Sequence, residues 1–485
     1  MLAIAVMGSG IAFLDGTVVN VALPSIGDDF GAETSSLQWI LNGYLLTLAS
    51  LILLGGSLGD RYGRRRIFVV GVAWFTVASL LCAIAPSANA LIAARLLQGV
   101  GGALLTPGSL AMIEASFRPG DRARAIGAWS GLGGVATALG PLLGGYLVEA
   151  VSWRAIFLIN VPIGLFVAAM APRHVPETRD PNAPAKLDAT GAVLAAIGLG
   201  GTTYALIEAP DKGMSAVTAV AGVAGVLALV AFLMVERRSA HPMMPLDLFH
   251  VRQFSAANLV TFVVYGALGG VFFLLVAFLQ ISAGYSPVAA GAASLPVTLL
   301  MLLFSARSGA LAQRIGARIP LTVGPIVIAG GMILMGRIPP DANYLTSVLP
   351  AVVVFGIGLT LVVAPVTATV LAAADSRHSG IASGINNAVS RVAGLLAVAV
   401  LPLVAGLTGD SFYDPAAMTD GFHTAMHVTA ALSILGGIIA WFTIDAEVLA
   451  ADDGPEEPTT GEFSCPVNGP AVFPEQREEA GSAGT

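Results

Sequence analysis

Two ionisable side chains stand inside long apolar runs, where a membrane would make them costly. Asp15 lies in the run that opens the chain, and Arg95 lies in a later one. A charged residue in a membrane helix usually faces a cavity or a partner and serves transport. A carboxylate there can take up and release a proton, and a nearby guanidinium can pair with it. We therefore interpret Asp15 and Arg95 as a proton-coupling pair. The alternative is an aspartate that only holds a neighbouring helix and an arginine that reaches the outer surface.

The depths of these two residues agree. If the first run ends near residue 23, Asp15 lies about 12 Å below the outer surface at about 1.5 Å per residue. If the fourth run begins near residue 90, Arg95 lies about 8 Å below the same surface. The two side chains can therefore meet. Asp15 would then weaken its bond to Arg95 whenever it takes a proton.

Further polar side chains lie within apolar runs and can line a substrate cavity. We assign to this cavity Asn20, Gln98, Gln280, Asn386, Asn387 and Arg391. Amides in membrane helices equally serve as hydrogen-bonding contacts between helices. The residues themselves leave both interpretations open.

A glycine- and arginine-rich loop follows the second apolar run, with the sequence Gly56-Ser-Leu-Gly-Asp60-Arg61-Tyr-Gly63-Arg64-Arg65. We expect Gly56 and Gly63 to form a tight turn. Asp60 can accept hydrogen bonds from helix-end amides or pair with Arg61 or Arg64, and so latch the two halves of the protein. The alternative is an arginine cluster that only fixes orientation.

Small residues recur at spacings of three and four in the fifth apolar run. This stripe ends with Gly140, Pro141, Gly144 and Gly145. Such a surface lets another helix approach closely and slide, which suits a gating element. Plain helix packing is the alternative.

The composition requires a membrane around these residues. Hydrophobic residues make up 56% of the 485-residue chain and charged residues only 11%, whereas a soluble protein has about a quarter charged residues. About 20 apolar residues span a bilayer. We identify fourteen such runs, at residues 2–23, 38–58, 67–85, 90–112, 125–148, 153–171, 189–208, 216–234, 254–280, 288–312, 319–336, 345–366, 379–406 and 423–444.

An internal repeat organises these runs. The segment from Gly56 to Arg65 aligns with Gly309 to Arg318 at an offset of 253, with five of ten positions identical. Gln313 replaces the acid there, so we expect a weaker latch. The sequence thus predicts an all-α membrane protein with two six-helix repeats, a pattern that many transporters use to rock around a central site. The expected parts are a bundle at 1–171, a linker with two additional helices at 172–253, a second bundle at 254–444 and a disordered acidic tail at 445–485.

The basic residues predict the orientation. With the N-terminus inside, the inner side carries 17 of the 23 Lys and Arg residues and the outer side only 3, while the remaining 3 lie within helices. Positive charge favours the cytoplasmic side. We therefore expect a multi-pass protein of the bacterial inner membrane with both termini in the cytoplasm.

With these motifs in place, the chain resembles the major facilitator superfamily, and within it the fourteen-helix drug:proton antiporters. Leu14 to Pro24 and Leu91 to Gly99 resemble the first- and fourth-helix motifs of that branch, and Gly140 to Gly145 resembles its antiporter signature. Ala136 stands where the family often has glycine, a mild departure. The resemblance implies the major facilitator fold and a secondary active transporter that exports small, drug-like molecules such as antibiotics in exchange for protons.

Other functions have less support. A proton-linked or facilitated transporter of an ordinary metabolite is the alternative within this class, and a non-transporting membrane sensor is one outside it. An ATP-binding loop needs Gly-Lys-Ser or Gly-Lys-Thr, and neither lysine provides it. His423 and His427 lack an obvious third ligand, so we expect no metal site. We also expect no enzymatic activity, no cofactor, no nucleic-acid partner and a monomer in the lipid bilayer.

Overall fold

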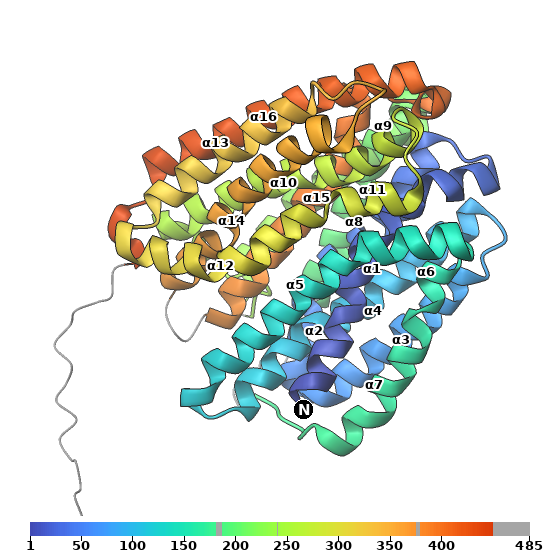
Figure 1. Cartoon of the computed structure of the whole chain (residues 1–485). Coiled ribbons are helices and arrows are strands. Elements are labelled where there is room, and N and C mark those ends of the chain that lie inside the picture. The colour runs from blue at the N-terminus through green and yellow to red at the C-terminus, as the bar shows by residue number, and fades with distance from the viewer. Residues whose placement is uncertain (181–186, 240, 375–378, 450–485) are drawn as a thin grey trace, which may run out of the picture. The chain divides into compact units, whose positions relative to one another are not determined.

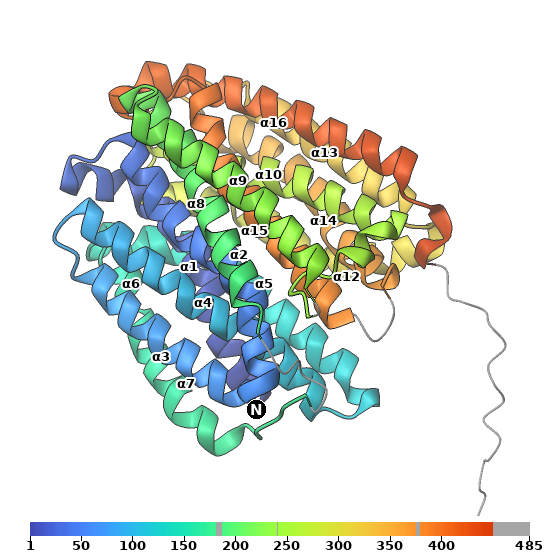
Figure 2. The ribbon, with the colours of Figure 1, turned by 180° about the vertical axis from the view of Figure 1, so that it is seen from behind.

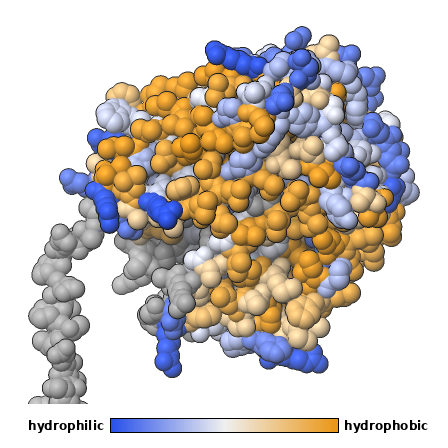
Figure 3. Space-filling model, viewed as in Figure 1, coloured by the Kyte–Doolittle hydropathy of each residue, from blue (hydrophilic) through white to orange (hydrophobic). Residues whose placement is uncertain are grey.

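The computed structural model describes residues 1–180, 187–239, 241–374 and 379–449. Within them all regular structure is helical, and 14 helical segments are long and apolar enough to cross a membrane. The expected all-α membrane class is confirmed. Figure 3 shows apolar residues over the middle of the molecule and hydrophilic residues toward its ends. Most of the expected acidic tail lies outside the described residues.

The first bundle contains six spans, the last of them in two pieces. Its helices are α1 (Leu2–Phe30), α2 (Thr34–Tyr62), α3 (Arg64–Ala83), α4 (Ala88–Ser116), α5 (Pro119–Ala150), α6 (Ala155–Leu158) and α7 (Asn160–His174). Two further spans follow as α8 (Ala189–Lys212) and α9 (Ala216–Arg238).

The second bundle repeats this plan after the short helix η1 (Leu246–His250). Its helices are α10 (Arg252–Ile281), α11 (Pro287–Ala293), α12 (Leu295–Ile315), α13 (Arg318–Met335), η2 (Tyr344–Val348), α14 (Leu349–Ala372), α15 (Ser379–Val404), η4 (Gly409–Tyr413), α16 (Pro415–Thr443) and η5 (Ala446–Leu449). Figure 1 shows α1 to α7 gathered on one side of the molecule and α10 to α16 on the other.

Several helices extend beyond the apolar runs that mark them. The first run ends near residue 23, but α1 continues through Pro24 to Phe30. Proline commonly ends a helix in water, whereas inside a membrane protein neighbouring helices satisfy the backbone groups that it leaves unpaired. Similarly, α2 runs to Tyr62. The expected tight turn at Gly56 is therefore wrong, because Gly56 lies within α2 and its added Cβ would stand at 3.7 Å from Pro107.

The two bundles share their packing plan. The first packs α2 on α4, α3 on α4 and α1 on α5, and the second packs α12 on α14, α13 on α14 and α10 on α15. Gly63 and Gly316, which the repeat aligns, both adopt positive φ, 114° and 87°, at the turn that follows the second span of each bundle. Glycine takes this conformation without steric penalty, so the repeat in the sequence is also a repeat in space.

The inserted pair lies at the junction of the bundles. α8 packs on α9 and also on α2 of the first bundle and α15 of the second. Figure 2 shows both helices along the rear of the molecule, between the bundles. The pair therefore covers one side of the junction.

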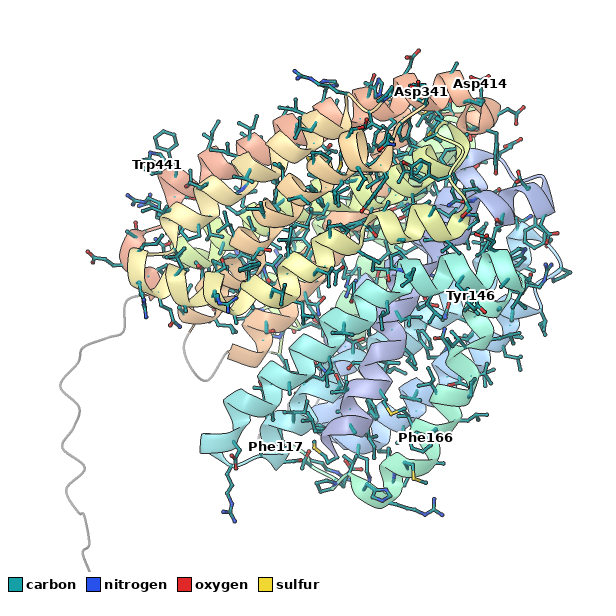
Figure 4. All side chains as sticks on the ribbon, viewed as in Figure 1. Phe117, Tyr146, Phe166, Asp341, Asp414 and Trp441 are labelled. Carbon is teal, nitrogen blue, oxygen red and sulfur yellow. The ribbon has the colours of Figure 1, made fainter. Side chains whose placement is uncertain are left out.

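Hydrogen bonds between the bundles gather at the end away from the arginine-rich loop at residues 61–66. There Thr34 Oγ1 donates to the Gly409 carbonyl at 2.7 Å, and Tyr413 Oη donates to the Ala32 carbonyl at 2.8 Å. Figure 4 shows Asp341 and Asp414 at this end and Phe117 at the opposite one, while Trp441 points outward from the flank.

Candidate functional site

Asp15 and Arg95 meet inside the first bundle. Nη1 of Arg95, on α4, lies 2.5 Å from Oδ2 of Asp15, on α1. The two side chains are 0% and 1% exposed. The structure thus brings together Asp15 and Arg95, whose similar depths below the outer surface had suggested that they can meet. A buried ion pair needs further hydrogen bonds to offset the loss of hydration.

Neighbouring polar groups supply these bonds. Gln98 Nε2 donates to Asp15 Oδ1 at 2.8 Å and to Ser79 Oγ at 2.9 Å, and Gln98 Oε1 accepts from Arg95 at 2.5 Å. Asn160 Nδ2 lies 3.4 Å from Asp15 Oδ1. Residues of four helices, α1, α3, α4 and α7, therefore form one hydrogen-bonded cluster around this carboxylate.

Arg95 is fixed on its other sides as well. Its Nε donates to the Ile40 carbonyl of α2 at 3.0 Å. The guanidinium carbon lies 4.5 Å from the centre of the Tyr44 ring and 5.8 Å from that of Phe157. Such cation–π contacts stabilise a desolvated cation by about 2 kcal/mol. The arginine is held in one orientation that presents its head to Asp15.

Gln98 requires a correction. We expected it in a substrate cavity, but it is fully buried within the first bundle and bonds both members of the ion pair. It follows Arg95 by three positions on α4, so both side chains leave the same face of that helix. Gln98 therefore forms a charged cluster together with Asp15 and Arg95.

Sequence reasoning missed Ser79 and Asn160 as members of this cluster. Both are fully buried. Each is a small polar residue in an apolar run, which is a weak signal because such residues also join helices without any role in transport. Asn160 Oδ1 accepts no hydrogen bond from the described residues. A buried polar atom of this kind is costly, and here it lies beside the carboxylate.

The other expected cavity residues lie apart from one another. Asn20 Nδ2 lies 3.5 Å from the Thr17 carbonyl within α1. Gln280 Nε2 donates across the junction to the Val21 carbonyl at 3.0 Å. Asn386 donates to Asn258 and Thr261 of α10 at 3.2 and 2.9 Å, inside the second bundle. The contacts of Gln280 and Asn386 join different helices, so Gln280 connects the bundles and Asn386 stabilises one of them.

Arg391 and Asn387 form a separate pair in the middle of α15. Arg391 Nε donates to Asn387 Oδ1 at 3.3 Å. The pair is partly buried. Among the described residues no carboxylate forms an ion pair with Arg391, in contrast to Arg95.

The expected latch at Asp60 also requires a correction. Asp60 pairs with Arg64 at 2.8 Å, and its carbonyl accepts from the Asp180 amide at 3.1 Å. The Arg64 amide donates to the Thr178 carbonyl at 2.9 Å. These contacts tie the loop to the segment after α7, on the same bundle. Among the residues that the structure describes, the latch holds the first bundle to the start of the linker, and none of these contacts reaches the second bundle. Arg61 lies over the Tyr62 ring at 5.2 Å.

The glycine stripe of α5 has two packed faces. A Cβ on Gly144 would lie 2.6 Å from Val18 Cγ2 of α1, and a Cβ on Gly140 would collide with Thr17 of the same helix. A Cβ on Gly145 would collide with the Pro287 carbonyl of the second bundle, and one on Gly291 would collide with the Pro141 carbonyl. Helix α5 thus touches the helix that carries Asp15 and the opposite bundle at once.

The other part of the stripe is open. A Cβ on Gly127, Gly131 or Gly134 would meet no atom within 4 Å. These glycines lie toward the arginine-rich end, whereas the packed ones lie toward the opposite end. Along α5 the bundles therefore touch at one end and part toward the other.

Comparison with known proteins agrees with this architecture. A profile of the Major Facilitator Superfamily matches residues 5–398. The chain is 36% identical over 456 residues to a puromycin resistance protein of Streptomyces alboniger, which covers 91% of this chain and 90% of that protein. It is 37% identical over 418 residues to a tetracenomycin C resistance and export protein of Streptomyces glaucescens, with 85% of this chain and 77% of that protein covered.

Solved structures show the same fold. A D-xylose-proton symporter matches with a TM-score of 0.64 at 15% identity, covering 92% of this chain and 97% of that one. A POT family transporter in complex with a thioalcohol conjugated peptide matches with a TM-score of 0.68 at 13% identity, covering 90% and 94%.

Proposed function

The chain belongs to the major facilitator superfamily, and from this premise we propose that it exports small, amphipathic, drug-like molecules in exchange for protons. The buried ion pair of Asp15 and Arg95, 2.5 Å apart, carries the proposal. An acid enclosed in a membrane bundle is costly, and such residues usually serve transport. The names of the resistance and export relatives support export as the direction. The protein is then a transporter that needs neither a cofactor nor an enzymatic step.

The proton acts through α1. When Asp15 takes a proton, its attraction to Arg95 weakens, because the carboxyl group becomes neutral. Helix α1 contacts α5 through Thr17 and Val18 and the second bundle through the Val21 carbonyl. A shift of α1 therefore reaches both α5 and the second bundle, which is how one proton changes the relative position of two bundles.

The proposed location is the bacterial cell membrane, with both termini in the cytoplasm. The excess of basic residues at the end of the molecule that carries Arg64 supports it. The bundles touch through Gly145 and Gly291 at the opposite end. With the arginine-rich end inside, this conformation opens toward the cytoplasm, where an exporter loads its substrate.

Everted membrane vesicles test the proposal. Their interior is acidified, and uptake of a fluorescent drug is followed with and without an uncoupler. Asp15→Asn keeps the size of the side chain and mimics the protonated state, so we expect it to abolish uptake driven by the pH gradient. Asp28→Asn is the matched control, since Asp28 lies on the same helix but is exposed.

Two results would contradict the proposal. One is uptake that requires ATP and ignores the uncoupler. The other is a normal pH-driven rate in the Asp15→Asn protein at equal expression. A purely structural role of Asp15 predicts misfolding in place of uncoupling. Comparing the elution profiles of the two variants in detergent distinguishes a misfolded Asp15→Asn protein from a folded but uncoupled one.

A further inference from the structure

Arg391 is a cation that forms no ion pair with a carboxylate in the described parts of the chain. It lies in the middle of α15 (Ser379–Val404), and its one hydrogen bond among the described residues joins Nε to Asn387 Oδ1 at 3.3 Å. The buried acid of the first bundle, Asp15, is already occupied by Arg95 at 2.5 Å. An arginine inside a membrane protein is costly, and it normally has a counter-charge or a functional ligand.

The face of α15 that carries Arg391 looks toward the first bundle. Val398, seven positions later, accepts from Gln38 of α2 at 2.7 Å. Gly384, seven positions earlier, faces Leu53 of α2, which would lie 3.1 Å from an added Cβ. Residues seven apart stand on one face of a helix. Arg391 therefore lies at the junction of the bundles, between two contacts with the same helix.

There is open space near this side chain. A Cβ on Gly394, about one turn later, would meet no atom within 4 Å. The apolar body of an amphipathic molecule can lie in this space while its polar end reaches the guanidinium.

We propose that Arg391 binds the carboxylate of the transported molecule, so that the substrates are amphipathic organic anions. This inference rests on the proposed function and names its substrate class. Asn387 holds Nε and fixes the plane of the guanidinium, which leaves both Nη groups for a bidentate bond to a carboxylate. The anion supplies the counter-charge that the described residues do not.

Two dyes of opposite charge on one xanthene body test the inference. Fluorescence anisotropy measures binding of fluorescein, an anion, and rhodamine 6G, a cation, to the purified full chain in detergent. We expect tighter binding of fluorescein. Arg391→Gln should weaken fluorescein binding at least tenfold and leave rhodamine 6G binding unchanged or stronger. Arg391→Lys keeps the charge without the planar fork and should give an intermediate loss.

Arg307→Gln is the matched control, because Arg307 is also an arginine within a helix of the second bundle but is exposed. It should leave the affinity for both dyes unchanged. The inference is overturned if the wild-type protein prefers rhodamine 6G, if it binds neither dye, or if Arg307→Gln acts like Arg391→Gln. Unchanged melting temperatures show that each variant is folded.

The two proposals fail in different ways. Proton-driven export of rhodamine 6G that stops in Asp15→Asn would keep the proposed function and remove the preference for anions. Fluorescein binding that depends on Arg391, in a protein whose export ignores the proton gradient, would do the reverse.

Discussion

Arg95 depends on the shape of its head group as well as on its charge. Nε reaches the Ile40 carbonyl, while Nη1 reaches Asp15 and Gln98. The flat guanidinium also lies over the Tyr44 ring. A lysine ammonium carries the same charge but cannot make these contacts together. The geometry of the cluster should therefore matter for coupling.

We expect Arg95→Lys to lower proton-driven export at least tenfold at equal expression, because Asp15 loses its fixed partner. Arg95→Gln should be worse, since removing one partner of a buried pair costs roughly 3–5 kcal/mol. Export from everted vesicles measures the first effect and thermal unfolding the second. Arg307→Lys, at an exposed position, serves as the control. Wild-type export by Arg95→Lys would show that positive charge alone is sufficient.

At the scale of an element, α5 is a helix whose glycines differ in what surrounds them. Gly145 packs against the backbone of α11, whereas Gly127 faces open space. Both residues are glycines of the same helix, and valine has a similar helix propensity at either site. A comparison of valine substitutions at the two sites therefore isolates the effect of the lost contact.

We expect Gly145→Val to separate the bundles at the end away from the arginines and to reduce export strongly. Gly127→Val should retain most of the export rate. Cysteines at Glu149 and Val288, where the carboxylate accepts from the amide at 3.4 Å, report the separation. A disulfide should form efficiently between these two cysteines in the otherwise unchanged protein and poorly in the protein that also carries Gly145→Val. Equal crosslinking in both backgrounds would remove the proposed role of the glycine contact.

At the scale of the whole molecule, the two ends differ in charge and in packing. The loop at residues 61–66 lies at the end where the bundles part along α5, and η4 (Gly409–Tyr413) lies at the end where they bond. If transport runs outward from this conformation, the arginine-rich end must face the cytoplasm. This requirement agrees with the distribution of basic residues.

Cysteine labelling on intact cells measures this orientation. Both native cysteines, Cys82 and Cys465, are first replaced by serine. A cysteine at Asp410, which is exposed, should react with an impermeant thiol reagent. A cysteine at Arg66, also exposed, should react only after the cells are permeabilised. The opposite pattern would invert the topology and, with it, the direction of transport.

The sequence by itself determined the class, the number of spans and the repeat. Hydropathy is a local property of the chain, so fourteen apolar runs can be recognised without knowing how they pack. The high energy of a charge in hydrocarbon likewise identified Asp15 and Arg95 from their position alone. Gly63 was recognisable because a turn of this kind needs a residue that tolerates positive φ, and the repeat aligned Gly316 with it.

The tertiary structure decided which faces of the helices meet. Asn160 of α7 lies beside Asp15, and Ser79 of α3 accepts from Gln98 and lies 3.4 Å from Asn160. Nothing along the chain distinguishes these two residues from other polar residues that join helices. For the same reason the sequence led us to expect Gln98 in a substrate cavity, whereas the structure places it in the charged cluster. Asp60 bonds Arg64 beside the segment after α7, where we expected a contact between the halves. Each of these contacts depends on the rotation of one helix against another, which is set by close packing between residues far apart in sequence.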